Sequence, residues 1–548
     1  MKLTHSYVHG ASDLPLIGQT IGDNLSETVS RLPDHEALVD HPSDRRWTYS
    51  ELEEWSRKVA RGLLARGVTT GDRVGIWSPN CAEWVVLQYA TAYIGAILVN
   101  INPAYRVHEL EYALRQSGVR TLVSATQHKT SDYRGMVDQV RGALPGLEDV
   151  IYIGDPTWPE LESSASRVDS GEIEAIGKTL AFDDPINIQY TSGTTGFPKG
   201  ATLSHHNILN NGYFIGEMLH YSEADRVCLP VPFYHCFGMV LGNLAATTHG
   251  ATIVIPAPLF DPDATLETVE KERCTSLYGV PTMFIAEFGS PRFESFDLTS
   301  LRTGIMAGAP CPVEVMKRVI SEMHMEQVAI AYGMTETSPV STQTRPDDDL
   351  DLRTATVGTV LPHVEIKVVD SDNRVVPIGT PGELCTRGYS VMLGYWEEPE
   401  KTAEVIDSAR WMHTGDLAVM REDGYLNIVG RIKDMVIRGG ENIYPREIEE
   451  FLFTHPAIED VAVVGVPDER YGEEVVAWIR LAPGADPLDA DTLRTFCLGK
   501  IAHNKIPRYV KLVDAFPMTV TGKIRKVEMR EISIGEFGLQ VAGGIETA

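Results

Sequence analysis

The stretch YTSGTTGFPKG, residues 190–200, gathers three glycines, four serine and threonine hydroxyls, a proline and one lysine into eleven positions. Glycine lets backbone amides approach an anion closely, hydroxyls add donors, and Lys199 adds a positive charge. The apolar residues Ile186 and Ile188 predict a strand that leads into this loop. A Walker A loop requires GxxxxGK followed by Ser or Thr, whereas Lys199 is followed by Gly200. The composition therefore predicts a phosphate-binding loop of another kind, although a flexible surface loop can share it.

The length and charge of the chain limit its function class. With 548 residues, 43% of them hydrophobic and 23% charged, it is too long for one core and is typical of a globular enzyme. The formal net charge of −28 argues against a nucleic-acid partner. The same charge opposes ATP and CoA, so a nucleotide site must be locally rich in amides, Lys, Arg or bound magnesium.

Cysteine usage and the N-terminal residues point to the cytoplasm. The seven cysteines show no CxxC spacing. The N-terminal residues lack the apolar region of a signal peptide, and the most apolar stretch, residues 84–99, is interrupted by Gln88 and Thr91. We therefore expect a cytoplasmic protein without a membrane span. Peripheral membrane contact and a homodimer stay open.

The pattern of apolar residues predicts an α/β fold in two parts. Helical and strand-like segments alternate from residue 51 onward, which indicates βα units on parallel sheets. Near residue 430 a charged turn and a glycine pair lead into a helix that begins near Pro445. We expect a large N-terminal domain of layered α/β subdomains over residues 1–432 and a small α+β domain over residues 433–548.

Two further turns carry side chains suited to a nucleotide. QVAIAYGMTETSPV, residues 327–340, runs from an apolar strand into a turn with Thr335 and Glu336. Magnesium prefers one or two carboxylates together with phosphate oxygens, so this pair suits a metal–phosphate site. In HTGDLA, residues 413–418, Asp416 is suited to accept hydrogen bonds from two ribose hydroxyls. Either turn alone is also typical of an ordinary capped or surface turn.

Together with their order along the chain, these motifs resemble the adenylate-forming superfamily of acyl-CoA synthetases, firefly-type luciferases and peptide-synthetase adenylation domains. AGAPC at 307–311, GRIKD at 430–434 and PMTVTGK at 517–523 add to the resemblance, which covers nearly the whole chain. GELCTRGYSVMLGYW, residues 382–396, and KDMVIRGGENIYPREIE, residues 433–449, are most similar to the medium- and long-chain fatty acyl-CoA synthetase branch.

The resemblance implies a site for ATP and AMP. In the family, the equivalent of Tyr332 lies against adenine, Thr335 contacts phosphate, and Glu336 binds magnesium. Asp416 matches a ribose contact, and Arg431 resembles a second ribose or phosphate contact. The ATP- and AMP-binding residues that it implies are Thr191, Ser192, Gly193, Thr194, Thr195, Lys199, Gly308, Ala309, Pro310, Tyr332, Gly333, Asp416 and Arg431.

It also implies acyl and CoA sites. In VPFYHCFGMV, residues 231–240, His235 matches a position that borders the acyl carboxylate. The substrate-binding residues that we expect are His235, Phe237 and Gly333, and the CoA-side residues are Gly439, Gly440, Glu441 and Asn442. Cys236 suggests a nucleophile, but it has no evident setting that lowers a thiol pKa, and the family mechanism uses no enzyme thiol.

The implied reaction has two steps. A carboxylate and ATP with Mg2+ give acyl-AMP and pyrophosphate, and the thiol of CoA then displaces AMP. Lys523 matches the family lysine that stabilises charge on the α-phosphate, so Lys523, Thr335 and Glu336 are the expected catalytic residues. In the family the C-terminal domain is mobile and rotates about a hinge, whose position Lys433 occupies here.

Two sequence features bear on the acid. Amino-acid-activating domains place an aspartate in the motif that here reads FYHCFG, and acetate-activating relatives block the acyl tunnel with tryptophan where this chain has Gly333. Both differences favour a medium- or long-chain fatty acid. The alternatives are a fatty acyl-AMP ligase, an aryl- or branched-acid CoA ligase, a luciferase-like oxygenase and an inactive nucleotide-binding regulator.

Overall fold

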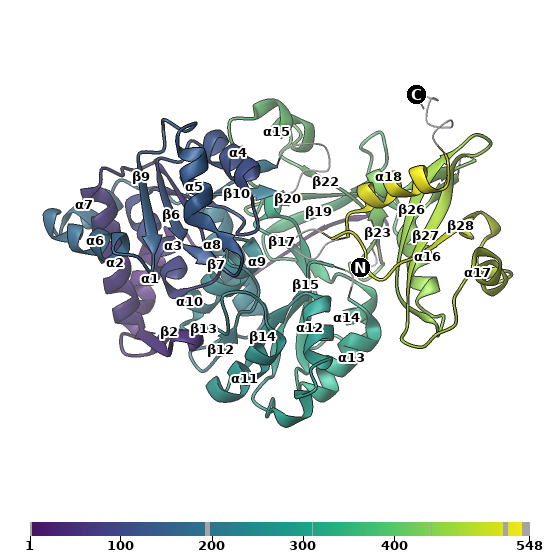
Figure 1. The fold of residues 1–548 in the computed structure, drawn as a ribbon, viewed down its shortest axis with the longest axis horizontal. Helices are drawn as coiled ribbons and strands as arrows, with labels where there is room; N and C mark the ends of the chain where they lie inside the picture. Colours follow the sequence, from purple (N-terminus) through teal and green to yellow (C-terminus); the bar gives the residue numbers. More distant parts are fainter. Residues whose placement is uncertain (1–2, 192–197, 310, 440, 519–523, 540–548) are drawn as a thin grey trace. The chain divides into compact units, whose positions relative to one another are not determined.

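The computed structural model describes residues 3–191, 198–309, 311–439, 441–518 and 524–539. The density of internal contacts divides the chain into two units (Figure 1). The larger unit comprises Val8–Ile366 and Thr386–Met412, and the smaller comprises Met1–Tyr7, Lys367–Cys385 and His413–Ala548. This division differs from a single cut after residue 432, and the domain boundary expected there stays a prediction.

The larger unit contains a seven-stranded sheet that carries the glycine-threonine loop. Its core is parallel, because β10 pairs with β5, β5 with β4, β4 with β6, and β6 with β9 in the same direction. Strands β11 and β21 extend it antiparallel at one edge. The order is β21 (Gly394–Tyr395), β11 (Lys199–Ser204), β10 (Pro185–Thr191), β5 (Ile97–Asn100), β4 (Arg73–Trp77), β6 (Thr121–Ala125) and β9 (Asp149–Ile153).

A nine-stranded sheet forms the second layer of strands in the larger unit. Its central strands are parallel, and β17, β18 and β3 are antiparallel additions near the edges. The order is β18 (Thr359–Val360), β17 (Val340–Gln343), β16 (Gln327–Gly333), β15 (Thr303–Ala307), β14 (Ser276–Gly279), β12 (Arg226–Cys228), β13 (Thr252–Ile255), β2 (Glu36–Asp40) and β3 (Arg45–Thr48).

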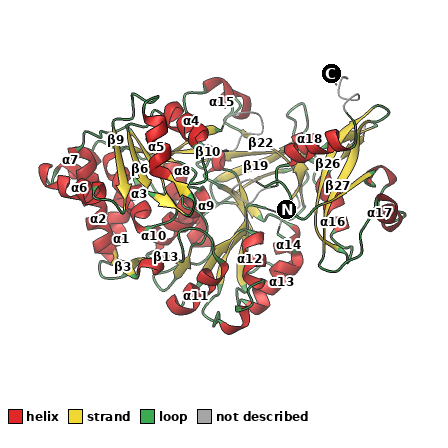
Figure 2. Cartoon of the chain, viewed as in Figure 1, coloured by secondary structure: helices red, strands yellow, loops and turns green. Residues whose placement is uncertain are grey.

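Helices fill the space between these two sheets and cover their outer faces (Figure 2). Helix α3 (Ala82–Ile94) contacts β5 of one sheet and β2 of the other, and every one of its residues is buried. Its apolar character all around the helix is what a central layer requires. Helices α4 (Val107–Ser117) and α5 (Tyr133–Arg141) cover the seven-stranded sheet, while α11 (Pro262–Glu272), α12 (Pro281–Phe288) and α13 (Val313–Glu322) cover the nine-stranded one.

The smaller unit is built on strands with helices on both faces. Helices α16 (Pro445–Leu452) and α17 (Ala490–Cys497) pack on one face, and α18 (Lys526–Glu536) packs on the other, where Trp478 Nε1 donates to Ser533 Oγ over 2.8 Å. The sheet order is β25 (Glu441–Ile443), β24 (Val436–Arg438), β27 (Gly472–Leu481) and β26 (Ile458–Asp468), with β28 (Tyr509–Leu512) beside β27.

A further sheet supplies the strands on which Asp416 and Arg431 lie. Its order is β1 (Tyr7–His9), β19 (Val364–Val369), β20 (Gly382–Gly388), β22 (Met412–Met420) and β23 (Leu426–Arg431). The predicted fold class, a layered α/β part with a smaller α+β part, is confirmed. Over the ranges that the structure describes, no helix has both the length and the apolar character that a membrane crossing needs.

The close spacing of β14 and β15 leaves no room for a side chain at Gly304, which can be tested by substitution. A Cβ at this position would lie 2.0 Å from the Leu277 carbonyl oxygen on the neighbouring strand. We expect Gly304→Ala to lower the free energy of unfolding by about 2–4 kcal/mol, because two paired strands must separate locally. The measurement is urea unfolding followed by circular dichroism.

Gly177→Ala is the matched control. Gly177 ends α7 (Glu172–Gly177), and a Cβ there meets no described atom within 4 Å. We expect a change within about 1 kcal/mol. Equal unfolding midpoints for the two variants would contradict the close approach at Gly304.

Candidate active site

Both ends of the glycine-threonine loop are held by the larger unit. Thr191 ends β10 and Lys199 begins β11, and the two residues pair directly across the antiparallel ladder. The hydroxyl of Tyr190 donates to Gln116 Oε1 over 2.6 Å, and the hydroxyl of Tyr112 donates to the Pro198 carbonyl over 3.1 Å. The helix α4 therefore contacts the described residues on either side of the loop. The predicted residues Ser192, Gly193, Thr194 and Thr195 lie outside the described residues.

The acidic turn after β16 presents a buried carboxylate. Thr335 and Glu336 belong to a short 3-10 turn, Thr335–Thr337, and are 8% and 5% exposed. The hydroxyl of Tyr395 donates to Glu336 Oε1 over 2.8 Å, and the Met392 amide donates to the Glu336 carbonyl over 2.9 Å. A buried carboxylate needs such partners, because burial without them is costly. The turn of the nine-stranded sheet is thereby attached to the edge of the other sheet.

Tyr395 also connects Glu336 with Lys199. The Lys199 Nζ lies 4.8 Å from the centroid of the Tyr395 ring, a cation–π distance. Tyr395 is placed there because β21 pairs with β11, with Tyr395 opposite Ala201. Burial, and next the charge of Glu336, raise the pKa of the Tyr395 hydroxyl, so it remains a neutral donor. One aromatic side chain thus holds together the predicted phosphate lysine and the predicted magnesium ligand.

The segment around His235 is tied to the strand that precedes the loop. His235 Nδ1 accepts from the Phe237 amide over 3.1 Å, which caps the short helix α9 (Cys236–Gly238). The ring of Phe237 stacks on Tyr278 with centroids 5.6 Å apart. Gln189 Oε1 on β10 accepts from both the amide and the thiol of Cys236, at 3.1 Å each. The expected acyl-side residues and the loop therefore share one buried support.

The chemistry of Cys236 is that of a packed thiol. Burial raises the pKa of Cys236, with a smaller contribution from the charge of Glu336. A thiol in this state is a poor nucleophile, because the thiolate is the reactive form. This environment fits the expected mechanism, which uses no enzyme thiol.

The predicted adenine-side residues lie at neighbouring strand ends. Strands β15 and β16 run parallel, with Ala307 opposite Ala331. Gly308 comes directly after β15, and Tyr332 is the penultimate residue of β16. Gly308 has φ +87, which favours glycine, and Gly308 and Ala309 are exposed. Ends of adjacent parallel strands form ligand sites in open α/β sheets. Pro310 lies outside the described residues.

A close backbone contact accounts for glycine at position 333, which the sequence interpretation did not consider. A Cβ at this position would lie 1.8 Å from the carbonyl oxygen of Pro339 in the same hairpin. A side chain here would force the hairpin backbone to shift, so this residue alone is not a measure of an open acyl tunnel. The tunnel and the substrate-binding role of Gly333 stay predictions.

The remaining predicted residues belong to the smaller unit. Asp416 is 6% exposed and lies opposite Arg431 in the β22–β23 ladder, where Arg431 Nε contacts Asp416 Oδ1 at 2.9 Å. Lys433 belongs to a 3-10 turn, Ile432–Asp434. The Gly439 amide donates to the Tyr471 carbonyl over 2.7 Å, and the Asn504 side chain donates to Glu441. Asn442 lies beside Glu441 on β25, whereas Gly440 and Lys523 fall outside the described residues.

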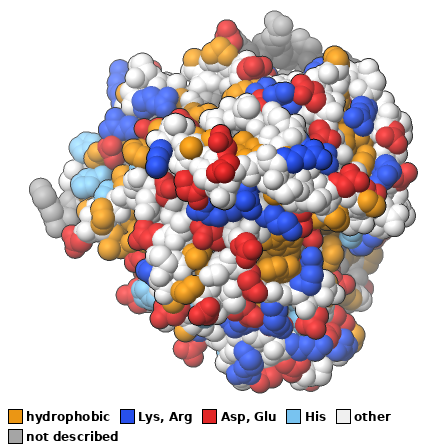
Figure 3. Space-filling model, turned by 90° about the vertical axis from the view of Figure 1, so that its left-hand side faces the viewer, with side chains coloured by type: hydrophobic (Ala, Val, Ile, Leu, Met, Phe, Trp, Pro, Cys, Tyr) orange, Lys and Arg blue, Asp and Glu red, His pale blue; other side chains and the backbone are white. Residues whose placement is uncertain are grey.

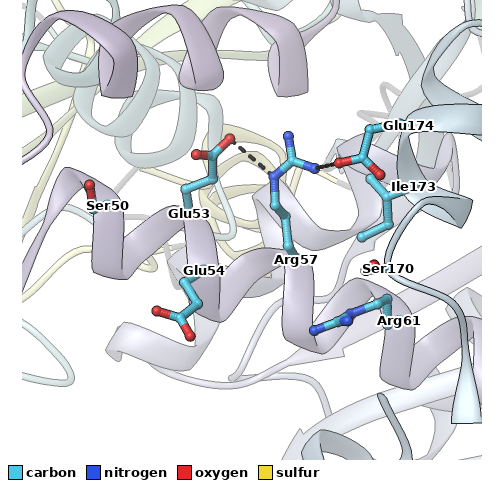
Figure 4. A pocket seen from close by; sticks show the side chains of 8 residues that line it. All are labelled: Ser50, Glu53, Glu54, Arg57, Arg61, Ser170, Ile173 and Glu174. Carbon is cyan, nitrogen blue, oxygen red and sulfur yellow. Dashed lines mark hydrogen bonds and ion pairs between the residues drawn. The ribbon is translucent and has the colours of Figure 1, made fainter. Parts of the chain in front are cut away.

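A separate surface cleft of about 320 Å³ contains none of the predicted site residues. It lies between α2 (Tyr49–Ala65) and the α7 region, and Arg57 there bridges Glu53 and Glu174 (Figure 4). With three carboxylates and two guanidinium groups, its lining does not favour an anion. Acidic and basic side chains are likewise interspersed over the face shown in Figure 3.

Comparison with known proteins decides the family. The description "AMP-binding enzyme" matches residues 25–396, and "AMP-binding enzyme C-terminal domain" matches residues 447–523. The chain belongs to the AMP-binding enzyme family. The predicted resemblance to adenylate-forming enzymes is confirmed by a match that covers more than half of the chain.

Individual relatives agree with this assignment. The chain is 49% identical to the putative acyl-CoA synthetase YngI of Bacillus subtilis, over 96% of this chain and 99% of that protein. It is 46% identical to the mitochondrial medium-chain acyl-CoA ligase ACSF2 of Danio rerio, over 98% and 92%. The crystal structure of the anthranilate CoA ligase AuaEII with anthranoyl-AMP is similar, with a TM-score of 0.83, 28% identity, and coverage of 95% and 98%. The prediction of an acyl-CoA synthetase, an AMP-forming acid–thiol ligase, is confirmed.

Sequence reasoning missed Tyr395 and Gln189. Tyr395 lies in GELCTRGYSVMLGYW and Gln189 in the strand expected before the loop, but neither has a distinctive chemistry in the sequence. Only strand pairing brings Tyr395 to Glu336, and only packing brings Gln189 to Cys236. The closest sequence signal for Tyr395 is its place directly after Gly394 in the branch-like stretch.

The Tyr395 contact predicts a specific loss. Tyr395→Phe removes the donor to Glu336 and keeps the ring near Lys199. Because a hydrogen bond to a charged group contributes about 1.5–3 kcal/mol, we expect acid-dependent ATP–pyrophosphate exchange to fall about ten- to hundredfold in kcat/KM.

Tyr152→Phe provides the control, since Tyr152 is on β9 at the opposite edge of the same sheet. We expect it to retain exchange activity within about twofold. Equal activities of the two variants would show that the Tyr395 hydroxyl has no part in this site.

Proposed function

We propose that this acyl-CoA synthetase activates a medium- or long-chain fatty acid through acyl-AMP and transfers it to CoA. The observation that carries the proposal is the contact of Tyr395 with both Lys199, where the glycine-threonine loop ends, and Glu336. It joins a cation and a carboxylate at the base of a glycine- and hydroxyl-rich loop. These are the groups that a triphosphate with a divalent cation requires.

Mg2+ fits the residues present. Glu336 offers a hard carboxylate that is 5% exposed and whose Oε1 is oriented by a neutral hydroxyl donor. When bound, Mg2+ would neutralise phosphate charge and so favour attack by the acyl carboxylate. Lys199 would attract the phosphates as a second positive charge, and Thr335 would donate a hydrogen bond to them.

The nucleoside roles in the smaller unit rest on Asp416 and Arg431. Their contact at 2.9 Å fixes the orientation of a carboxylate that is 6% exposed. A carboxylate oriented in this way can accept hydrogen bonds from vicinal ribose hydroxyls. We assign Asp416 to binding of the ribose. We assign Arg431 either to orienting Asp416 or to contact with a phosphate.

Apolar surroundings support a fatty acid. Phe237 and Tyr278 stack beside His235, and the described part of this segment brings no carboxylate that would pair with an amino acid's ammonium group. The Danio rerio relative is named a medium-chain acyl-CoA ligase. The AuaEII structure contains an aryl adenylate, so an aryl or branched acid is the second candidate.

The location and assembly of the protein remain proposals. All seven cysteines are free thiols, which supports a reducing compartment such as the cytoplasm. The Danio rerio relative is named as mitochondrial, so a compartment other than the cytoplasm is the alternative. Sedimentation tests the proposed homodimer, and vesicle binding tests the proposed peripheral membrane contact.

An acid panel tests the proposed substrate. We expect AMP release to depend on CoA and to be fastest with fatty acids of medium or long chain, because an apolar pocket contributes about 0.8 kcal/mol for each buried methylene. The measurement is AMP formation with acetate, octanoate, palmitate, a branched acid, benzoate and an amino acid, each with and without CoA.

The same panel separates the alternatives. Acyl-AMP accumulation that CoA does not accelerate would favour an acyl-AMP ligase, and light output with oxygen uptake would favour a luciferase-like enzyme. Best turnover of acetate or an amino acid would overturn the fatty-acid proposal. Absence of pyrophosphate release with every acid would favour an inactive regulator.

The proposal assigns Lys523 to the first step only, which gives a second test. We expect Lys523→Ala to lower acyl-AMP formation about a hundredfold or more, because one oxyanion-stabilising group contributes roughly that factor. Thioester formation from supplied acyl-AMP should be largely retained. The measurements are the two half-reactions, each followed separately by rapid quench.

Lys433→Pro is the counterpart variant at the proposed hinge. It should retain adenylation and slow thioester formation, because proline restricts the backbone rotation that the second step would need. Parallel loss of both half-reactions in the Lys523 variant, or an unchanged second step in the Lys433 variant, would contradict these assignments.

A further inference from the structure

Three side chains of metal-ligating type converge in the smaller unit, and none of them has a role in the proposed reaction. Glu383 and Cys385 lie two positions apart on β20, so they point to the same face of the sheet. His413 lies on β22, the next strand in that sheet. A carboxylate oxygen, the Cys385 Sγ and a ring nitrogen of His413 all lie within 4.8 Å of one another.

The individual distances are close to those around a tetrahedral ion. His413 Nδ1 lies 3.4 Å from Cys385 Sγ and 2.8 Å from Glu383 Oε2. With zinc–ligand bonds of about 2.0–2.3 Å, neighbouring ligand atoms of a tetrahedron are about 3.2–3.8 Å apart. The distance from Nδ1 to Sγ falls in this range, and the carboxylate oxygen would move away from Nδ1 by about half an ångström to admit the ion.

The chemistry at Nδ1 also suits a cation. The thiol and the carboxylate approach the same nitrogen, which can either donate one proton or accept one. A cation in the place of that proton accepts an electron pair from all three ligand atoms at once. On binding, the Cys385 thiol releases its proton to solvent and the imidazole binds in its neutral form.

Neighbouring hydrogen bonds orient Glu383 and join the two strands, and the exposure of the site leaves room for a fourth ligand. The Gly415 amide donates to Glu383 Oε1 over 3.1 Å, which leaves Oε2 directed at His413. Thr414 Oγ1 donates to the Leu384 carbonyl over 2.8 Å, which joins the two strands at this position. Cys385 is buried, while the side chains of Glu383 and His413 are 21% and 23% exposed, so a water molecule can complete the coordination.

We propose that Glu383, Cys385 and His413 form a binding site for a transition-metal cation of the Zn2+ class. Thiolate and imidazole ligands select Zn2+, Co2+ or Cu over Mg2+, so this site is chemically distinct from the one at Glu336. The ion would join β20 to β22 three residues before Asp416. Metal binding would thereby stiffen the segment that presents the ribose carboxylate.

Co2+ is the probe for this site, because its spectrum reports thiolate ligation directly. We titrate the full-length protein with Co2+ in the presence of excess Mg2+ and record absorption in the ultraviolet and visible. We expect one equivalent to produce a thiolate-to-cobalt charge-transfer band together with the strong visible bands of tetrahedral cobalt. Zn2+ should displace it stoichiometrically.

Four variants locate the ligands. Cys385→Ser should abolish the charge-transfer band, while Glu383→Gln and His413→Gln should weaken Co2+ binding at least about tenfold. Cys311→Ser, which alters a half-buried thiol outside the cluster, should bind as the parent protein does. Circular dichroism establishes that each variant is folded, and Glu383→Gln tests the site at a partly exposed position if Cys385→Ser does not fold.

The proposal is overturned if the parent protein gives no charge-transfer band at one equivalent. It is equally overturned if the band persists in folded Cys385→Ser, or if Glu383→Gln and His413→Gln bind Co2+ as tightly as Cys311→Ser does. These readouts require no turnover, so they are independent of the proposed fatty-acid substrate.

Discussion

The hydrogen bond from Tyr395 to Glu336 is the interaction on which the candidate site depends. A carboxylate that is 5% exposed must have a partner, and the partner here is a hydroxyl whose own pKa is raised by burial. A neutral donor leaves the negative charge in place, whereas a cation would neutralise it. The Tyr395 hydroxyl therefore satisfies the buried Glu336 without competing for the role at Mg2+ that we propose for this carboxylate.

This interaction also unites two layers of the larger unit. Glu336 follows β16 of the nine-stranded sheet, and Tyr395 lies on β21 at the edge of the seven-stranded sheet. The same tyrosine ring contacts Lys199 at the start of β11. The position of Lys199 relative to Glu336 thus follows from strand pairing at one sheet edge, not from the loop itself.

Much of the fold could be predicted from the sequence, whereas the roles assigned to the site residues stay predictions. Alternating helical and strand-like segments predicted layered α/β structure, because apolar periodicity reflects burial directly. The motif residues Lys199, Glu336 and Asp416 were also evident, since their side-chain chemistry is local to each turn. Gly333 shows the limit of this reasoning: its sequence suggested an open tunnel, whereas the carbonyl of Pro339 excludes a side chain there.

The sequence by itself determined the family, the reaction class and the residues whose chemistry is visible within a single motif. Only the tertiary structure decided that Tyr395 supports Glu336, that Gln189 supports Cys236, and that Glu383, Cys385 and His413 meet. The physical reason is that hydrogen bonds and metal ligands act over about 2–4 Å. Residues 28 to 59 positions apart reach such distances only through strand register and packing, which no single motif encodes.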